Sequence, residues 1–444
     1  MKFLKFFLIV TVLLPISSYS QNIPTVLSLD ECIQIALKNN PQLKISRNQL
    51  GIAEQEQKKS YSNILPSVDV AARYSRFYQA PTIYAGGTQL PEDQKIPSSD
   101  GNNYSTSLDI FQNIFDGGYW WNNISKTKRD RAAQEYSFFV EKQRTIVSVQ
   151  QAYITLVKDL KLLDVNRQAV QRSEEQLQRT QTQYELGAVA KVDVFQARTN
   201  LGNDKIALLT QENAVLSSRQ NLNMVMGRDP QETIEIKTDI EVTFDVPSLD
   251  SLFQVALQNN PSLKQYEESY QSARLGTKLA TSNYWPRLGA FFSYSRRTPE
   301  FETALFKNFD ENYSWFAGIN ISWNIFRGFS DYRNRQQAKL NEKIALETSV
   351  DNRRTVMSQV KGLSDNLESY IEIIKINEQN LESSREQYRL AEERYRVGSG
   401  TQLEVREAQV NLTRAEEILV GAENNAIITY AQLLEAIGAL VDAY

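Results

Sequence analysis

The chain has 444 residues, with 49 lysines and arginines against 53 aspartates and glutamates, so its formal net charge is −4. This mild acidity argues weakly against a nucleic-acid partner. The sequence has no histidine, which removes the commonest zinc ligand and the usual general base of serine and cysteine hydrolases. No cofactor or metal site is implied, and we do not expect an enzyme.

The first twenty residues, 1–20, predict a secretory signal peptide. Two lysines precede an apolar run from Phe6 to Leu14, and the small residues at positions 18 and 20 suit cleavage near Ser20 and Gln21. The run is too short to span a bilayer, and no later segment reaches the roughly 18 to 20 apolar residues of a membrane helix. A mature chain that crosses a membrane must therefore use strands.

The only cysteine, Cys32, lies shortly after this predicted cleavage site. One cysteine cannot form an intrachain disulfide, so the stability of the exported chain must come from packing and assembly. We interpret Cys32 as a core residue of a short amphipathic helix. This helix is predicted to break at Asn40-Pro41, because proline disfavours a helical residue before it, and a second helix follows and ends near Pro66.

From Val68 the apolar period changes from that of a helix to that of a strand. Apolar and polar side chains alternate from Val68 to Ser75 and again from Tyr104 to Ile110. The segment 79–102 between them contains several prolines and glycines, and it predicts a surface loop at one end of a barrel.

A very long helix is predicted from about 120 to 186, because this segment has scarcely any glycine or proline. At about 1.5 Å per residue it would extend on the order of 100 Å. We expect it to turn at Gly187 and to return through 191–226, which makes a helical hairpin. A small connecting region follows at 228–247.

The whole pattern then occurs a second time. Residues 28–44 match residues 248–264 at eleven of seventeen positions, and after the first strand of each copy the offset falls from 220 to 211. The second copy predicts alternating strands near 287–294 and 315–325. It also predicts a long helix from about 330 to 397, a turn at Gly398 and a return through 402–437.

We therefore predict a first repeat at 21–227, a connecting segment at 228–247 and a second repeat at 248–444. The apolar residues of each long helix alternate steps of four and three, which is typical of a coiled-coil seam. The seam of the second helix contains Val356, Val360, Leu363, Leu367, Tyr370, Ile374, Asn377, Leu381, Ser384, Tyr388, Ala391 and Tyr395, and a shift of 211 residues gives a similar seam from Val149 to Tyr184.

Two observations favour membrane strands over the half-buried strands of a soluble sandwich. The alternating runs reach the roughly 9 to 11 residues that cross a bilayer. Tryptophans also gather where strands meet helices, which is typical of a membrane interface. The predicted membrane belt consists of Trp120, Trp121, Trp285 and Trp323.

Four strands cannot close a barrel, and open strand edges in lipid would leave backbone groups without hydrogen bonds. Two chains would give eight strands and a barrel filled by side chains, whereas three give twelve and leave room for a pore. We therefore expect a mainly α-helical homotrimer with membrane β structure. Four β-strands per chain contribute to a shared 12-stranded barrel.

The paired Asn-Asn-Pro-x-Leu motifs, the strand-to-helix turns at Asn113 and Asn324, and the Tyr-x-x-Gly hairpin tips together resemble TolC-like outer membrane efflux proteins. The resemblance covers essentially the whole mature chain, and two ordered copies of the full set make it specific. It implies a trimeric channel in outer membrane lipid, whose long helices form a coiled-coil barrel that extends into the periplasm. Its implied partners are a periplasmic membrane-fusion adaptor and an inner-membrane transporter.

The resemblance also implies where two functional regions lie. In the family the hairpin tips contact the adaptor. The candidate adaptor contacts are therefore Leu186, Gly187, Ala188, Val397, Gly398 and Ser399. The alternative is structural, because a glycine that reverses two helices is fully explained by the backbone angles of a helix end.

Glu404 and Glu407 share a helix face and match acidic positions at the channel constriction of the family. In a trimer they would form two rings, which favour cations in channels, although a solvated helix face is the alternative. Asp193 and Tyr395 match family residues that help to hold the entrance closed. Gly400 stands where some relatives have an arginine latch, so this chain closes by another contact or rests more open.

We expect a passive conduit that exports substrates in a tripartite efflux or secretion system, with energy supplied by the inner-membrane transporter. The cargo stays open between a drug-like molecule, a metal ion and a polypeptide, and small-molecule efflux is the commoner role in the family. The alternative is a surface-anchored structural or adhesive coiled-coil protein, which the alternating strands and paired hairpins oppose.

Overall fold

The computed structural model describes residues 26–440 apart from 82–83, 86–87, 90, 95, 240–243, 245 and 308–309. The predicted signal peptide at 1–20 and its cleavage site lie outside the described residues. The chain forms two compact units, and each takes segments from both halves of the sequence. The first unit comprises Met1–Asn39, Ser148–Thr243 and Ile373–Ile428, and the second comprises Asn40–Val147, Phe244–Glu372 and Thr429–Tyr444.

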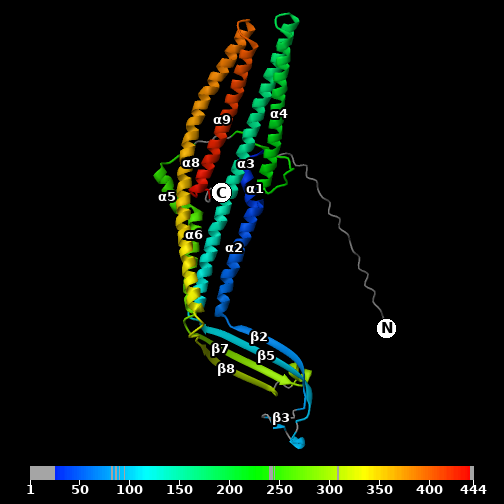
Figure 1. Ribbon diagram of the computed structural model, residues 1–444, viewed down its shortest axis with the longest axis vertical. Helices are drawn as coiled ribbons and strands as arrows, with labels where there is room; N and C mark the ends of the chain where they lie inside the picture. The colour runs from blue at the N-terminus through cyan, green and yellow to red at the C-terminus, as the bar shows by residue number, and fades with distance from the viewer. Residues whose placement is uncertain are drawn as a thin grey trace, which may run out of the picture. The chain divides into compact units, whose positions relative to one another are not determined.

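The elements follow the order that the repeat predicts (Figure 1). The main elements of the first half are α1 (Leu29–Asn39), α2 (Pro41–Ser60), β2 (Ser67–Gln79), β5 (Ser99–Phe115), α3 (Tyr119–Glu185) and α4 (Lys191–Met226). Those of the second half are α5 (Leu249–Asn259), α6 (Pro261–Ser282), β7 (Arg287–Thr298), α7 (Phe301–Leu305), β8 (Tyr313–Ser322), α8 (Ser330–Arg396) and α9 (Gln402–Ala436). The predicted long helices are confirmed, and each begins or ends within a residue of the prediction.

Both Asn-Pro motifs break the helix as predicted, and the structure shows how. The side-chain Oδ1 of Asn40 accepts hydrogen bonds from the backbone N–H groups of Gln42 (2.8 Å) and Leu43 (3.2 Å), while Pro41 opens α2. This is an N-cap, which satisfies amides that lack a partner in the first helical turn. Asn260 repeats the cap on Leu263, and its amide also donates to the carbonyl of Ala436 at 2.8 Å.

In the first unit the predicted seams supply much of the core. Val149, Leu156 and Leu381 are buried, and Leu381 packs with Leu412 of α9. A short parallel pair joins β1 (Val26–Leu27) to β6 (Glu235–Ile236) in the connecting segment. The buried hydroxyl of Tyr153 donates to the carbonyl of Leu27 on β1 and to that of Lys237, directly after β6, so α3 is fixed against this pair. Cys32 is fully buried in α1, as predicted.

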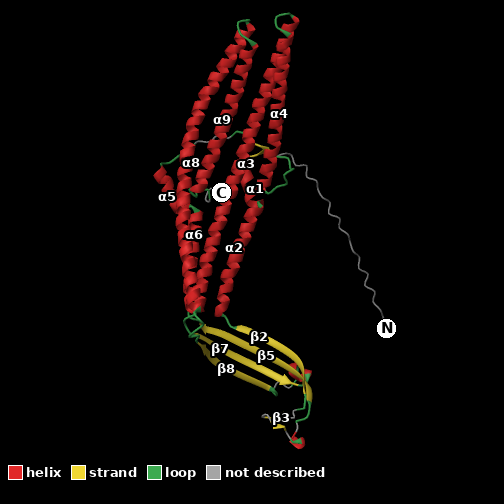
Figure 2. Ribbon diagram, in the orientation of Figure 1, coloured by secondary structure: helices red, strands yellow, loops and turns green. Residues whose placement is uncertain are grey.

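The second unit contains the sheet (Figure 2). Its strand order is β2-β5-β7-β8, and every neighbouring pair is antiparallel. The register places the predicted apolar residues of all four strands on one face, because Val70 lies opposite Leu108, Phe292 opposite Ala317 and Leu288 opposite Ile321. We call this side of the sheet the apolar face and the opposite side the polar face.

The apolar face is largely open to solvent in this single chain. Val70 is 78% exposed, Ile319 67% and Ile321 71%, although each is a large hydrophobic side chain. Exposed apolar area of this extent marks a surface that packs against something else. In the described part of the chain the outer strands β2 and β8 also have a strand neighbour on one side only.

The strand boundaries differ from the prediction in two places. β5 already begins at Ser99, inside the segment 79–102 predicted as loop, whereas β8 ends at Ser322 although the alternation continues to Ile325. Alternation shows which side chains share a face, but a strand also needs a neighbouring strand for its backbone hydrogen bonds. β8 ends at Ser322 because its neighbour β7 begins opposite that residue. The polar face also carries Phe111. Its ring fits beside Gly289 because glycine has no side chain, whereas a Cβ at position 289 would lie 2.7 Å from the ring.

None of the helices in the described segments is sufficiently long and apolar to span a membrane.

Candidate channel surfaces at the hairpin tips and the sheet

The two hairpin tips have the same backbone design. In the first, the N–H of Gly187 donates to the carbonyl of Tyr184 and the N–H of Ala188 donates to that of Gln183. In the second, Gly398 and Ser399 make the equivalent bonds to Tyr395 and Arg394. Each glycine has a left-handed φ, +77° and +79°, which is the Schellman end of a helix and favours glycine.

The predicted tip residues lie at the ends of the hairpins and are exposed. Leu186 is 79% exposed and Val397 is 73% exposed, while a Cβ on either glycine would meet no atom within 4 Å in the described part of the chain. The turn geometry explains the glycines without any partner. It does not explain why each turn presents a large apolar side chain to solvent, so the tips remain candidate docking surfaces.

The side chains of Asp193 and Tyr395, both in the described segments, bind different partners. The carboxylate of Asp193 accepts a hydrogen bond from the N–H of Ala190 at 3.0 Å, which caps the start of α4. Tyr395 is 8% exposed, and its hydroxyl donates to the side-chain oxygen of Gln183 at 2.6 Å. Tyr395 thus joins the second hairpin to the first, whereas Asp193 stabilises the first hairpin itself.

Glu404 and Glu407 lie in the first two turns of α9. Glu404 is half-buried and forms an ion pair with Arg394 at 3.5 Å, and its N–H lies 3.2 Å from the Thr401 hydroxyl that caps the helix. Glu407 is exposed and makes no hydrogen bond or ion pair within the described segments. The two predicted constriction residues are therefore unequal, because only Glu404 is partly neutralised by a cation.

A buried polar cluster behind the tips was not predicted. Arg406 of α9 binds Asp204 of α4 through two hydrogen bonds of 2.8 and 3.0 Å. Ser173 of α3 donates to the same carboxylate, and Gln409 donates to Ser173 at 3.0 Å. A partly buried bidentate pair is among the stronger polar contacts. The one signal in the sequence is Ser173, a polar residue that the shift of 211 places at the seam position equivalent to Ser384.

The predicted membrane belt lies at the end of the sheet where strands meet helices. Trp121, Trp285 and Trp323 are each about 60% exposed, and the indole N–H of Trp323 donates to the carbonyl of Tyr284. Trp120 stacks on Trp121 with ring centroids 4.3 Å apart. An exposed tryptophan with a bonded N–H and a bare ring suits an interface with one wet and one apolar side.

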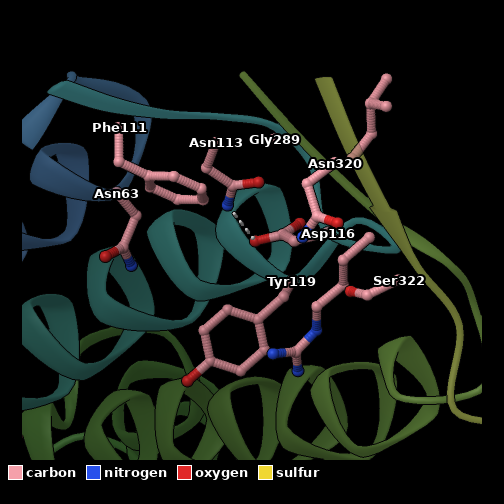
Figure 3. A pocket seen from close by; sticks show the side chains of 10 residues that line it. Asn63, Phe111, Asn113, Asp116, Tyr119, Gly289, Asn320 and Ser322 are labelled. Carbon is pink, nitrogen blue, oxygen red and sulfur yellow. Dashed lines mark hydrogen bonds between the residues drawn. The ribbon is translucent and has the colours of Figure 1, made fainter. Parts of the chain in front are cut away.

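On the polar face, the same end of the sheet carries a small pocket (Figure 3). Asn113 donates to Asp116 at 3.2 Å, and Asp116 in turn accepts from the N–H of Trp120 at 3.1 Å, so it caps α3. Arg287 from β7 also lines the pocket, and its guanidinium binds Asn283. The bonding is structural, since it fixes the strand-to-helix turn at Asn113 that the sequence singles out.

Comparison with known proteins decides the family. The model of the family described as "Outer membrane efflux protein" matches residues 32–228 and 252–439, which means that it matches once in each half. The chain belongs to the outer membrane efflux protein family. This membership makes it an outer membrane channel for efflux or secretion in tripartite systems, extending into the periplasm, and not an enzyme. The adhesive alternative is thereby excluded.

Individual relatives resemble the chain along nearly its full length. It is 24% identical to the outer membrane protein TolC of Vibrio cholerae, over 93% of this chain and 91% of the relative. It is 22% identical to the alkaline protease secretion protein AprF of Pseudomonas aeruginosa, over 94% and 85%. The fold matches the crystal structure of the Campylobacter jejuni CmeC outer membrane channel, with a TM-score of 0.80 at 20% identity over 92% of this chain and 85% of that one.

Proposed function

We propose that three copies of the chain share one 12-stranded β-barrel, with the polar face of each sheet toward a water-filled lumen and the apolar face toward lipid. One observation carries this proposal: the sheet has an exposed apolar face together with two edge strands that lack a further neighbour in the described part of the chain. Each unpaired edge in lipid would leave a row of backbone groups without hydrogen bonds. Sharing the barrel removes both edges at once.

Strand directions support the same closure. All neighbouring pairs are antiparallel in the order β2-β5-β7-β8, so the two outer strands run in opposite directions. β8 of one copy can therefore pair with β2 of the next as another antiparallel pair. Any number of copies would satisfy this rule, and three is the smallest number that leaves an open lumen.

The remaining partners follow from two separate surfaces, the hairpin tips and the tryptophan belt. The exposed residues Leu186 and Val397 at the hairpin tips suit a periplasmic membrane-fusion adaptor, which would join the channel to an inner-membrane transporter. The tryptophan belt suits outer membrane lipid. In a trimer Glu404 and Glu407 would form acidic rings near the entrance, with Asp193 and Tyr395 beside them. We propose no nucleic-acid partner.

We also propose that the two sequence repeats are the structural units of the channel. Residues 21–227 and 248–444 each supply two strands and one long helical hairpin, and 228–247 connects them. These features do not identify the cargo, because relatives that match along nearly the whole chain are named both for efflux and for protease secretion. Small-molecule efflux is the role we propose first, since it is the commoner one in the family.

Cross-linking between edge strands tests the shared barrel. Cysteines are placed on β2 at Val70 or Ala72 and on β8 at Ala317 or Ile319, all on the apolar face, and the membranes are oxidised. Cys32 will not interfere, because it is buried and burial raises the pKa of its thiol to about 12. We expect at least one pair to give linked dimers and trimers on a denaturing gel.

The control pair replaces Ile110 and Phe292, which lie opposite each other within one sheet. This pair should cross-link inside a single chain and leave the denatured mass at that of a monomer. If every β2–β8 pair also stays monomeric while the control pair reacts, the shared barrel is wrong.

A further inference from the structure

The polar face carries a transverse row of two arginines with a serine between them. Arg73 on β2 lies directly opposite Ser105 on β5, and Ser105 lies directly opposite Arg297 on β7. Side chains at directly opposed positions point to the same face of a sheet, so both guanidiniums rise from the polar face beside one hydroxyl. We call Arg73, Ser105 and Arg297 the arginine row.

Neither arginine of the row is neutralised within the described segments. Both side chains are exposed, and neither forms an ion pair or a side-chain hydrogen bond there. Arg76 lies only three residues from Arg73 but on the apolar face, and it is paired with Asp100 at 3.0 Å. The two free cations are therefore a property of the polar face and not of this end of the sheet in general.

The closest pair of opposed acidic residues on the polar face lies far from the arginine row, and one of its carboxylates already accepts hydrogen bonds. Asp69 lies opposite Asp109, and the carboxylate of Asp109 accepts hydrogen bonds from Ser107 and Ser293. Four residues of strand separate this row from the arginine row, which is about 13 Å. That distance exceeds the screening length of roughly 8 Å at physiological salt, so the acidic row does not cancel the positive charge.

The surroundings of the arginine row can donate further hydrogen bonds. A hollow in the sheet is lined by Arg73 and Arg297 together with Ser105, Ser107, Ser295 and Ser314. None of the described residues that line it is acidic. Guanidinium groups present planar pairs of N–H donors that match carboxylate, sulfate and phosphate oxygens, and hydroxyls can donate to the same oxygens.

We propose that the arginine row is a binding station for oxyanions in the lumen. It rests on the proposed function, because the polar face must line a pore for a dissolved anion to reach it. In a trimer the row is present three times and surrounds the lumen with six arginines. Anionic groups of cargo, such as carboxylates, would bind there transiently. The acidic residues near the tips, Glu404 and Glu407, would instead attract cationic groups.

Sulfate is the probe in the test. The wild-type protein is reconstituted in a planar bilayer, its KCl current is recorded, and potassium sulfate is added to each side in turn. We expect a voltage-dependent block by sulfate. Replacing both arginines by glutamine, Arg73→Gln with Arg297→Gln, should weaken this block by on the order of tenfold, because charge-assisted hydrogen bonds to the anion are lost.

Two further variants keep the result specific. Arg76→Gln removes the same charge from the apolar face and should leave the sulfate block unchanged. Arg73→Lys with Arg297→Lys keeps the charge and should retain most of the block. Equal block in the wild type and in the double glutamine variant, or a conducting wild type that sulfate never blocks, would overturn the binding station while leaving the channel intact. A wild type that is extracted as a single chain and not as a trimer would overturn the proposed function, and the station with it.

Discussion

Glu404 and Glu407 lie one helical turn apart at the start of α9, but only Glu404 has a cation beside it. A partly exposed ion pair such as Glu404 with Arg394 is weak, yet it lowers the net negative charge that Glu404 presents. Glu407 presents its full charge. If the two residues line the entrance, their contributions to ion selectivity must therefore differ.

We predict that Glu404→Gln with Glu407→Gln reduces the preference of the channel for cations, because the local potassium concentration follows the fixed negative charge. Of the single variants, Glu407→Gln should have the larger effect. The reversal potential in a KCl gradient across a planar bilayer measures this. The control is Glu378→Gln with Glu382→Gln, which removes two exposed charges from α8. An unchanged reversal potential in the first double variant would contradict the acidic rings.

Glu435 in α9 provides a test of stability against pH. Burial is the main cause that raises the pKa of this carboxyl above its ordinary value of 4.5, and the nearby Arg144 partly opposes the shift. A raised folded-state pKa means that the folded protein holds the proton more tightly than the unfolded chain does. The stability that this group contributes is therefore present below pH 4.5 and is lost as the pH rises through the folded-state pKa.

We predict that Glu435→Gln raises the thermal unfolding midpoint at pH 7, because the amide removes a charge that burial disfavours. At pH 4, where the wild-type carboxyl is largely protonated in the folded state, the gain should shrink. Melting curves of the detergent-solubilised protein at both pH values measure the difference, with Glu378→Gln as the exposed control. A gain that is the same at both pH values would show that packing and not ionisation is responsible.

At the scale of elements, the two hairpin turns are the parts on which export is expected to depend. Both glycines have a left-handed φ, and a non-glycine residue with this conformation costs about 1–2 kcal/mol. We predict that Gly187→Leu and Gly398→Leu impair export while the trimer forms normally, because bulk at the tip obstructs docking and the strain stays local. Export is measured as the drug resistance that the protein confers on an efflux-deficient host.

The controls separate bulk at the tip from bulk elsewhere. Gly202→Leu adds the same side chain to α4, where a Cβ would meet no atom within 4 Å in the described segments and where φ is not left-handed. It should leave export unchanged. Gly187→Asn tolerates the left-handed conformation with less bulk and should retain part of the activity. Normal export by both leucine variants would count against docking at the tips.

The elements could be predicted from the sequence where a period or a backbone requirement is local. The alternation from Val68 fixes which side chains share a face, and Asn40-Pro41 and Gly187 each demand a break or a turn wherever they stand. Contacts between hairpins could not be predicted in the same way. The bond of Tyr395 to Gln183 and the pair of Arg406 with Asp204 join residues about 200 positions apart, and no local pattern identifies such partners.

The repeat itself misleads at one position. Tyr184 and Tyr395 are equivalent at the offset of 211, and both were predicted in the seam. Tyr395 is buried, whereas Tyr184 is 42% exposed. Equivalent residues keep the same helical phase, but each hairpin has different neighbours, so burial need not be repeated. The membrane belt and the constriction are predictions of the same kind, because they depend on neighbouring copies of the chain.

At the scale of the whole molecule, every proposal depends on assembly. In the part that the structure describes, a single chain exposes the apolar face of its sheet and leaves the outer edges of β2 and β8 without a strand partner. In one barrel of three copies these edges would pair with each other, and the apolar face would contact lipid. The acidic rings, the tryptophan belt and the six-arginine station all require the same three-fold arrangement.

The most direct test is the mass of the species extracted from the outer membrane with detergent, with the contribution of bound detergent subtracted by light scattering. The account predicts three chain masses at all protein concentrations, because a shared barrel is an obligate assembly. A species of one chain mass, whether in detergent or in the soluble fraction, would contradict the shared barrel and the lumen that the other proposals require.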